Sequence, residues 1–103
     1  MIIFSLKSII VNSLRNEYYH PGDYICKEGE PGNCLYIIKE GEVECIKGDK
    51  IIRILKKGDN FGQKALLEGD KRSLDVRAKT NCTLFNIPKD FFFELDPKVN
   101  RKE

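Results

Sequence analysis

Residues 61–76 read FGQKALLEGDKRSLDV, and the interpretation of the whole chain starts from this stretch. A Phe-Gly pair opens it, a short apolar helical turn is expected at residues 63–67, and Arg72 follows just before a strand-like run. Gly62 allows the backbone to approach a ligand closely, while the start of a helical turn and a guanidinium both favour a small anion. The stretch therefore predicts an anion-binding turn set within a larger fold.

On both sides of this stretch, glycines and Pro-Gly pairs separate short apolar runs. The runs have ordinary strand lengths and cover residues 24–27, 35–39, 43–47, 51–55, 75–79 and 82–87. So many short strands in a small chain would leave open sheet edges unless a barrel or a two-sheet jelly roll closes them. The sequence therefore predicts a mainly β protein, a jelly-roll barrel over residues 18–87 with the anion-binding turn inside it.

Helices are expected at both ends of this barrel. Apolar residues recur at helical spacing over residues 5–16, and a proline at a helix start predicts a second helix over residues 88–96. The 103 residues are about one small domain in length, so the chain is interpreted as a single domain over residues 1–103. We expect it to be a fragment of a larger protein.

Composition and charge exclude several classes of function. The chain is 41% hydrophobic, and its 18 basic and 16 acidic residues are evenly spread, so no basic stripe favours nucleic acid. No apolar run approaches the length of a membrane span, and no secretory leader is recognised, so a cytoplasmic protein is expected. The four cysteines lack metal-ligand spacing and are interpreted as small buried hydrophobes.

The single histidine, His20, has no second imidazole or cysteine near it in the sequence. Neither a metal site nor a catalytic residue is therefore expected. A cupin-like enzyme on a similar jelly roll would need a cluster of histidines and carboxylates for its metal, which one histidine cannot supply.

Residues 61–76 resemble the phosphate-binding cassette of cyclic nucleotide-binding domains. These are the regulatory domains of cGMP- and cAMP-dependent protein kinases, cyclic nucleotide-gated channels and bacterial catabolite activators. The matching positions fit without an insertion and are Phe61, Gly62, Ala65, Leu66, Leu67, Arg72, Ser73 and Val76. Residues 20–25 (HPGDYI), 28–33 (EGEPGN) and 35–38 (LYII) also resemble family motifs in the same order, so the resemblance covers about residues 18–95.

The resemblance implies a role for each cassette position. Arg72 would bind the cyclic phosphate, helped by the backbone N–H groups of Ala65 and Ser73. Gly62 and Gln63 would hold the ribose 2′-OH. Ser73 also favours cGMP, because its hydroxyl can bond the guanine amino group, although cAMP stays possible.

The resemblance also implies a regulatory function without catalysis by the domain itself. Leu66 and Leu67 would relay ligand binding to the helix that follows. The partner would be a kinase catalytic domain or a neighbouring cyclic nucleotide-binding domain of the same polypeptide. The expected parent is a cGMP-dependent serine/threonine protein kinase whose autoinhibition is relieved by the ligand, and no cofactor is expected.

Four residues depart from the family pattern. Gln63 stands where the family has a glutamate for the ribose, and Asn33 stands where a loop aspartate usually braces the cassette arginine. Leu74 and Asp75 add bulk and a negative charge near the expected phosphate position. These departures leave an alternative open: a degenerate domain that binds nucleotide weakly or not at all and serves as a structural relay.

Overall fold

The structure, a computed structural model, describes residues 16–69 and 71–89. Within these ranges the strands form two four-stranded sheets, in the orders β1-β8-β3-β6 and β2-β7-β4-β5. Every strand pair in both sheets is antiparallel. The strands are β1 Asn16–Tyr19, β2 Tyr24–Cys26, β3 Cys34–Glu40, β4 Glu42–Lys47, β5 Lys50–Lys56, β6 Asn60–Phe61, β7 Asp75–Ala78 and β8 Cys82–Pro88.

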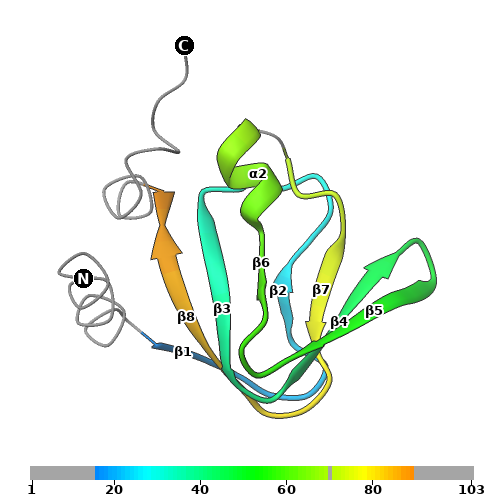
Figure 1. Cartoon of the computed structure of the whole chain (residues 1–103). Coiled ribbons are helices and arrows are strands. Elements are labelled where there is room, and N and C mark those ends of the chain that lie inside the picture. Colours follow the sequence, from blue (N-terminus) through cyan, green and yellow to red (C-terminus); the bar gives the residue numbers. More distant parts are fainter. Residues whose placement is uncertain (1–15, 70, 90–103) are drawn as a thin grey trace, which may run out of the picture.

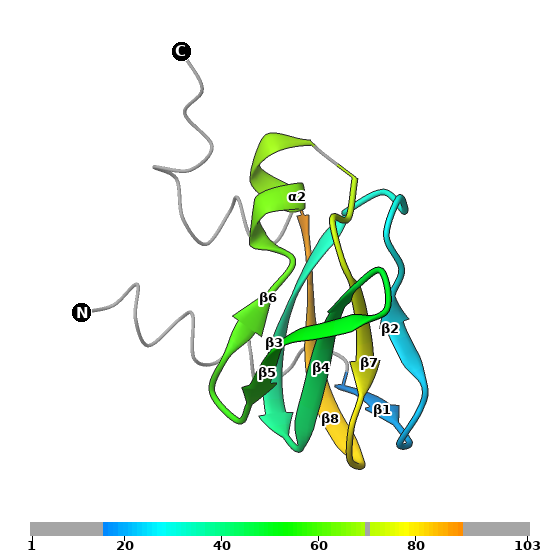
Figure 2. The ribbon, with the colours of Figure 1, turned by 90° about the vertical axis from the view of Figure 1, so that its right-hand side faces the viewer.

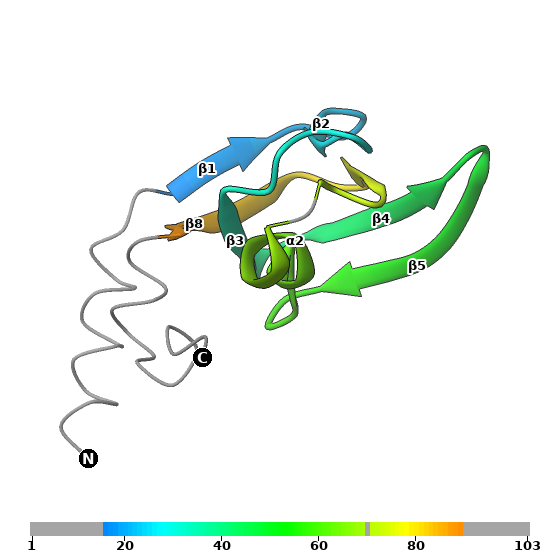
Figure 3. The ribbon, with the colours of Figure 1, turned by 90° about the horizontal axis from the view of Figure 1, so that it is seen from above.

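The two sheets lie against each other, and one short helix sits at one end of them (Figures 1 and 2). This helix, α2, spans Gln63–Glu68 and follows β6 directly. Seen from above, α2 lies beside β3, while the β4–β5 hairpin extends away from the rest of the molecule (Figure 3). The arrangement confirms the predicted mainly β jelly roll, with the short helix of the cassette where the sequence placed it.

The core between the sheets is built from residues that alternate along the strands. Ile38, Val43 and Leu84 are the largest fully buried side chains, and they come from β3, β4 and β8. Successive side chains of a strand point to opposite faces, and buried and half-buried residues accordingly alternate along β7 and over parts of β4 and β8. Burying an aliphatic side chain of this size stabilises the fold by about 1.5–3 kcal/mol.

Two strands were not predicted, and the ends of the predicted helices need correction. The six predicted runs correspond to β2, β3, β4, β5, β7 and β8, but β1 and the two-residue β6 are additional. Asn16 begins β1 rather than ending a helix, and Pro88 is the last residue of β8 rather than the first of a helix. The other residues of the helix predicted over 5–16, and residues 90–96 of the second helix, lie outside the described residues.

The strand β5 forms an edge of its sheet and is exposed along nearly its whole length. Its only neighbour in the sheet is β4. Ile51, Ile52 and Ile54 are 49%, 52% and 46% exposed, while Leu55 is half-buried against the core. Within the part of the chain that the structure describes, the strand therefore leaves apolar side chains and one edge of its backbone open on the projecting hairpin.

Gly41, between β3 and β4, is required by both its backbone angle and its surroundings. Its φ is +93°, a conformation that residues with a side chain rarely adopt. A Cβ at this position would overlap the carbonyl oxygen of Asn81 and lie 2.8 Å from the Cys82 sulfur. Gly48, in the β4–β5 turn, also has a positive φ of 62°, but a Cβ there would meet nothing within 4 Å.

These two glycines make a matched pair for a stability measurement. Gly41→Ala should lower the free energy of unfolding by more than about 2 kcal/mol, because it adds a clash with backbone to the strain of a left-handed conformation. Gly48→Ala should cost only about 1 kcal/mol, which is the strain alone. Urea unfolding of both variants checks this, and equal losses would show that the contact between Gly41 and residues 81–82 contributes nothing.

Candidate functional site

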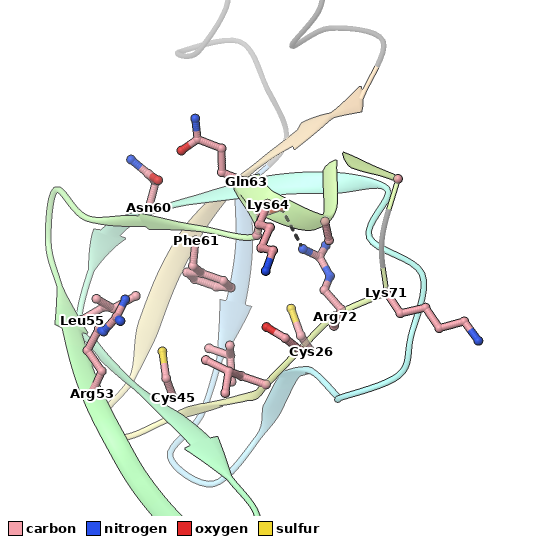
Figure 4. Close-up of a pocket in the computed structure, with 16 residues that line it drawn as sticks. Cys26, Cys45, Arg53, Leu55, Asn60, Phe61, Gln63, Lys64, Lys71 and Arg72 are labelled. Carbon is pink, nitrogen blue, oxygen red and sulfur yellow. Dashed lines mark hydrogen bonds between the residues drawn. The ribbon is translucent and has the colours of Figure 1, made fainter. Parts of the chain in front are cut away.

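A cavity of about 750 Å³ opens between the start of α2 and the inner face of the β2-β7-β4-β5 sheet (Figure 4). Its walls come from β2, β4, β5, β6, α2 and the segment that runs into β7. The volume is within the range of pockets that hold small ligands. Most of the cassette of residues 61–76 lines it, so residues adjacent in sequence surround one space.

Arg72 is the buried charge of this cavity, with only 8% of its surface exposed. Its Nη2 donates to the carbonyl oxygen of Cys34 at 2.9 Å and lies 3.6 Å from the Cys34 sulfur. Its Nη1 donates to the carbonyl oxygen of Gly62 at 3.3 Å. No carboxylate among the described residues forms an ion pair with this guanidinium. A buried cation that has neutral partners and no carboxylate is under-compensated, and a small anion is the partner that best completes it.

The backbone of Arg72 joins the cassette to the preceding loop, residues 27–33. Its N–H donates to the carbonyl of Glu30 at 2.7 Å, and its carbonyl accepts from the N–H of Gly29 at 2.8 Å. Gly32 of the same loop is so close to α2 that a Cβ there would overlap the Cβ of Ala65. Loop and cassette are therefore packed together without a gap.

The Arg72 guanidinium lies over the ring of Tyr36, which is itself stacked on Phe61. Tyr36 and Phe61 are stacked with their centroids 5.1 Å apart, and the central carbon of the Arg72 guanidinium lies 5.9 Å from the centre of the Tyr36 ring. Both rings are buried. A guanidinium over an aromatic face is attracted by the ring's quadrupole, so this stack restricts where the charge of Arg72 can lie.

Arg77, five residues later, has the carboxylate partner that Arg72 lacks among the described residues. Its Nε and Nη2 both donate to the Glu44 carboxylate, at 3.1 and 2.9 Å. Hydrogen bonding to Glu44 raises the pKa of Arg77 above its ordinary value. Arg77 of β7 is therefore already paired with a carboxylate, whereas Arg72, just before β7, is not paired with one among the described residues. Of the two, Arg72 is the arginine suited to bind an anion.

The structure brings most of the predicted cassette residues to the cavity. Gly62 caps α2 with a φ of 91°, and a Cβ there would overlap Nη1 of Arg72, so a glycine is needed for the guanidinium to lie against this turn. Ala65 is buried in the wall, and Ser73 is exposed at the rim. Gln63 also lines the opening, but its amide points out of the cavity (Figure 4).

The other predicted residues lie around the cavity rather than in it. Asn33 is exposed, its carbonyl accepts from the N–H of Lys89 at 3.0 Å, and the neighbouring Cys34 supplies the hydrogen bond to Arg72. Leu66 and Leu67 belong to α2, where Leu67 is half-buried and outside the cavity lining. These positions leave Asn33 without a described hydrogen bond to the arginine it was expected to brace.

Leu74 and Asp75 differ in how they affect the site. Leu74 lines the cavity and packs against the core. The carboxylate of Asp75 accepts a hydrogen bond from the N–H of Glu28 at 2.8 Å, and Asp75 does not line the cavity. The carboxylate of Asp75 is thus hydrogen-bonded to the loop of residues 27–33, whereas the side chain of Leu74 takes up room at the cavity wall.

Sequence reasoning missed two parts of the site. Arg53 of β5 lines the cavity, and the signal for it was a single cation inside the apolar run of residues 51–55. The Cys34 carbonyl, which holds Arg72, carries no sequence signal because every residue has one.

Two thiols, Cys26 and Cys45, also line the cavity. Burial raises the pKa of the Cys26 thiol to about 12, and burial raises the pKa of Cys45 as well. All four cysteines of the chain are free, and Cys26, Cys45 and Cys82 are buried, as expected for small hydrophobes. The thiols at the cavity therefore stay protonated and add no negative charge to it.

The two packed antiparallel sheets and the short helix form a β jelly roll whose cavity contains a buried arginine with no carboxylate partner among the described residues. The sequence matches the family model of the cyclic nucleotide-binding domain over residues 16–96. The chain belongs to the cyclic nucleotide-binding domain family. This confirms the resemblance drawn from the cassette.

Protein kinases and kinase regulatory subunits are among its relatives. The cGMP-dependent protein kinase of Toxoplasma gondii is 42% identical over 90 residues, which is 87% of this chain and 9% of the kinase. The cAMP-dependent protein kinase regulatory subunit of Hypocrea atroviridis is 35% identical over 89 residues, covering 86% of this chain and 19% of the subunit. The chain therefore corresponds to one small part of these relatives.

Solved structures give the same result for the fold. One described as "Sp-2Cl-cAMPS bound to PKAR CBD2" has a TM-score of 0.78 and 31% identity, covering 84% of this chain and 59% of that one. The catabolite activator protein of Thermus thermophilus has a TM-score of 0.83 at 20% identity, covering 93% of this chain and 47% of that one, and supports the fold alone. In residues 16–69 and 71–89, no helix has the length and hydrophobicity needed to cross a membrane.

The raised pKa of Cys26 predicts a loss of stability in alkali. The thiol ionises near 9.0 when unfolded but near 12 when folded, so its contribution is complete below pH 9 and is lost as the pH rises toward 12. Between about pH 9 and 10, the free energy of unfolding should fall by about 1 kcal/mol from this group. Cys26→Ala should reduce this slope, as measured by urea unfolding at several pH values, and an unchanged slope would contradict the assignment.

Proposed function

We propose that this domain binds a cyclic nucleotide, with cGMP favoured, and that Arg72 is the residue on which binding depends. The observation that carries the proposal is a guanidinium that is 8% exposed, lines a cavity of about 750 Å³ and has no carboxylate partner among the described residues. A cyclic phosphate offers this cation a charged acceptor in place of carbonyl dipoles, and hydrogen bonds between charged groups are roughly twice as strong as neutral ones.

The neighbouring cassette residues complete the proposed nucleotide site. The backbone N–H groups of Ala65 and Ser73 assist Arg72 at the phosphate, and Gly62 and Gln63 hold the ribose. The loop that contains Asn33 keeps Arg72 in place, a role supported by its hydrogen bonds to the Arg72 backbone. Leu66 and Leu67 relay occupancy to the chain that follows α2.

Two residues at the cavity support a preference for guanine. The Ser73 hydroxyl is at the rim, where it can accept a hydrogen bond from the guanine amino group. Arg53 lines the cavity from β5, and a guanidinium fork matches the O6 and N7 acceptors of guanine. Adenine offers an amino group in place of O6, which repels the same fork.

The domain acts, in this proposal, as the sensor of a cGMP-dependent serine/threonine protein kinase in the cytoplasm. The similarity to the Toxoplasma kinase supports this parent. Ligand binding then relieves autoinhibition of a catalytic domain in the same polypeptide, directly or through a neighbouring cyclic nucleotide-binding domain. Catalysis belongs to that domain and not to this one.

A degenerate domain that acts only as a structural relay is the second candidate. Two observations favour it. The Gln63 amide points out of the cavity (Figure 4), and Leu74 is one of the residues that line the cavity. Titration with fluorescent cGMP and cAMP separates the two candidates, because a sensor binds nucleotide tightly, whereas the relay binds it weakly or not at all.

Removal of the Arg72 guanidinium should weaken cGMP binding at least about tenfold, because a hydrogen bond to a charged group is worth about 1.5–3 kcal/mol. Arg77→Ala is the matched control, since Arg77 is paired with Glu44 and does not line the cavity. Calorimetric titration of both variants, with thermal unfolding to confirm that they fold, checks this. Equal affinities for Arg72→Ala and the unchanged protein would refute the assignment of the phosphate site.

Base selectivity gives an independent test of the cavity. Ser73→Ala should weaken cGMP about threefold to tenfold, the value of one hydrogen bond, and leave cAMP within about twofold. Competition of each nucleotide against a fluorescent analogue measures the ratio. A parallel loss for both nucleotides would mean that Ser73 contacts only the phosphate.

A further inference from the structure

Four polar side chains lie on the core-facing side of the β1-β8-β3-β6 sheet. They are Glu17, Tyr19, Tyr36 and Asn86. Glu17 of β1 pairs with Leu84 of β8, and Leu84 is fully buried. Tyr36 of β3 is itself a core residue and pairs with Asn86. Opposite residues of neighbouring strands share a face, and β1, β8 and β3 lie side by side, so these side chains gather inside the barrel (Figure 1).

The four side chains form a hydrogen-bonded network that ends at the carboxylate of Glu17. The Tyr19 hydroxyl donates to Oε1 of Glu17 at 2.5 Å, and the Asn86 amide donates to Oε2 at 2.6 Å. The Tyr36 hydroxyl is within hydrogen-bonding reach of the Tyr19 hydroxyl. A carboxylate can only accept, so the proton of Tyr19 is committed to Glu17, and the Tyr19 oxygen is left to accept from Tyr36.

The same network reaches Arg72 through Cys34. The Tyr36 hydroxyl is also within hydrogen-bonding reach of the Cys34 thiol. Nη2 of Arg72 lies 3.6 Å from the Cys34 sulfur, and the central carbon of the guanidinium lies 5.9 Å from the centre of the Tyr36 ring. Because Tyr36 donates to Tyr19, its oxygen is free to accept from the thiol. A chain of donors therefore runs from a buried cation to a carboxylate on another strand.

We propose that Tyr36 is a positioning residue for Arg72, and that Glu17 holds Tyr36 in place through Tyr19. The ring of Tyr36 attracts the guanidinium, and its hydroxyl holds the thiol that lies beside Nη2, so both parts of this side chain limit where the charge can lie. Each hydrogen bond of such a chain polarises the next. The inference rests on the proposed function, because it concerns how the arginine is held ready for a cyclic phosphate.

Two substitutions cut the chain without removing a ring or a large side chain. Tyr36→Phe keeps the stacking on Phe61 and removes only the hydroxyl, and Glu17→Gln keeps the size and removes the charge. Each should weaken cGMP binding about threefold to tenfold in calorimetric titration, the value of one hydrogen bond. The double variant should bind within about twofold of the weaker single variant, because a chain cut in the middle no longer transmits a change at its end.

Tyr24→Phe is the matched control. It also removes a hydroxyl near an arginine, since the Tyr24 oxygen lies 3.5 Å from Nη1 of Arg77, but neither residue lines the cavity. This variant should leave the affinity for cGMP within about twofold of the unchanged protein. Thermal unfolding of every variant confirms that each one folds.

The NMR resonance of the Arg72 Nε–H group, in protein without ligand, gives a second measurement that a merely structural role would not move. Its assignment comes from its loss in Arg72→Lys. The resonance should shift in Tyr36→Phe and in Glu17→Gln, although the aromatic ring is kept in both, and stay in place in Tyr24→Phe. Lower thermal stability with an unchanged affinity and an unchanged resonance would show that Tyr36 and Glu17 only support the fold, and would overturn the proposal.

The remaining outcomes separate this inference from the proposed function. If the effects of the two single variants multiply in the double variant, Glu17 and Tyr36 act independently, and the chain between them is overturned. If the unchanged protein binds no nucleotide, the proposed function fails and the resonance alone decides the positioning role. A shift in both variants then supports that role, and no shift in either overturns it.

Discussion

A buried guanidinium that no carboxylate of the described residues pairs with is the constraint around which this domain is organised. Desolvating a cation is costly, and the carbonyls of Cys34 and Gly62 compensate for only part of the cost. The same residue bonds the preceding loop through its own N–H and carbonyl groups. Arg72 thus links the start of β3, the start of α2 and the loop of residues 27–33 beside the cavity.

The other charged pairs of the molecule have a different character. Lys47 lies 2.7 Å from Glu28, and Lys57 lies 3.9 Å from Glu40, with all four side chains about half exposed or more. Exposed pairs of this kind contribute little stability, about 0–1 kcal/mol. Among the described residues, Arg72 is thus buried without a carboxylate partner, whereas the lysine pairs lie in solvent and the Arg77–Glu44 pair is partly shielded.

Local signals explain what the sequence predicted and what it did not. The glycines and Pro-Gly pairs fix the turns, so the strands between them could be located, and the spacing from Gly62 to Arg72 located the cassette. The strand β6 has two residues and exists only because Tyr36 and Ile37 pair with it, which no local pattern reports. Likewise, Asn33 was expected to hold Arg72, but the acceptor is the backbone of the next residue, and its direction is set by the path of β3.

The exposed strand β5 has a consequence for how the molecule behaves at high concentration. An open sheet edge that carries Ile51, Ile52 and Ile54 is a template for pairing with a second copy. Lys50, Arg53 and Lys56 are spaced evenly along the same strand. If two copies paired antiparallel about Arg53, each Lys50 would lie opposite Lys56 of the other copy. If they paired parallel and in register, each of the three cations would lie beside the same residue of the other copy. Repulsion between these like charges therefore opposes self-association through the edge, although its isoleucines stay exposed.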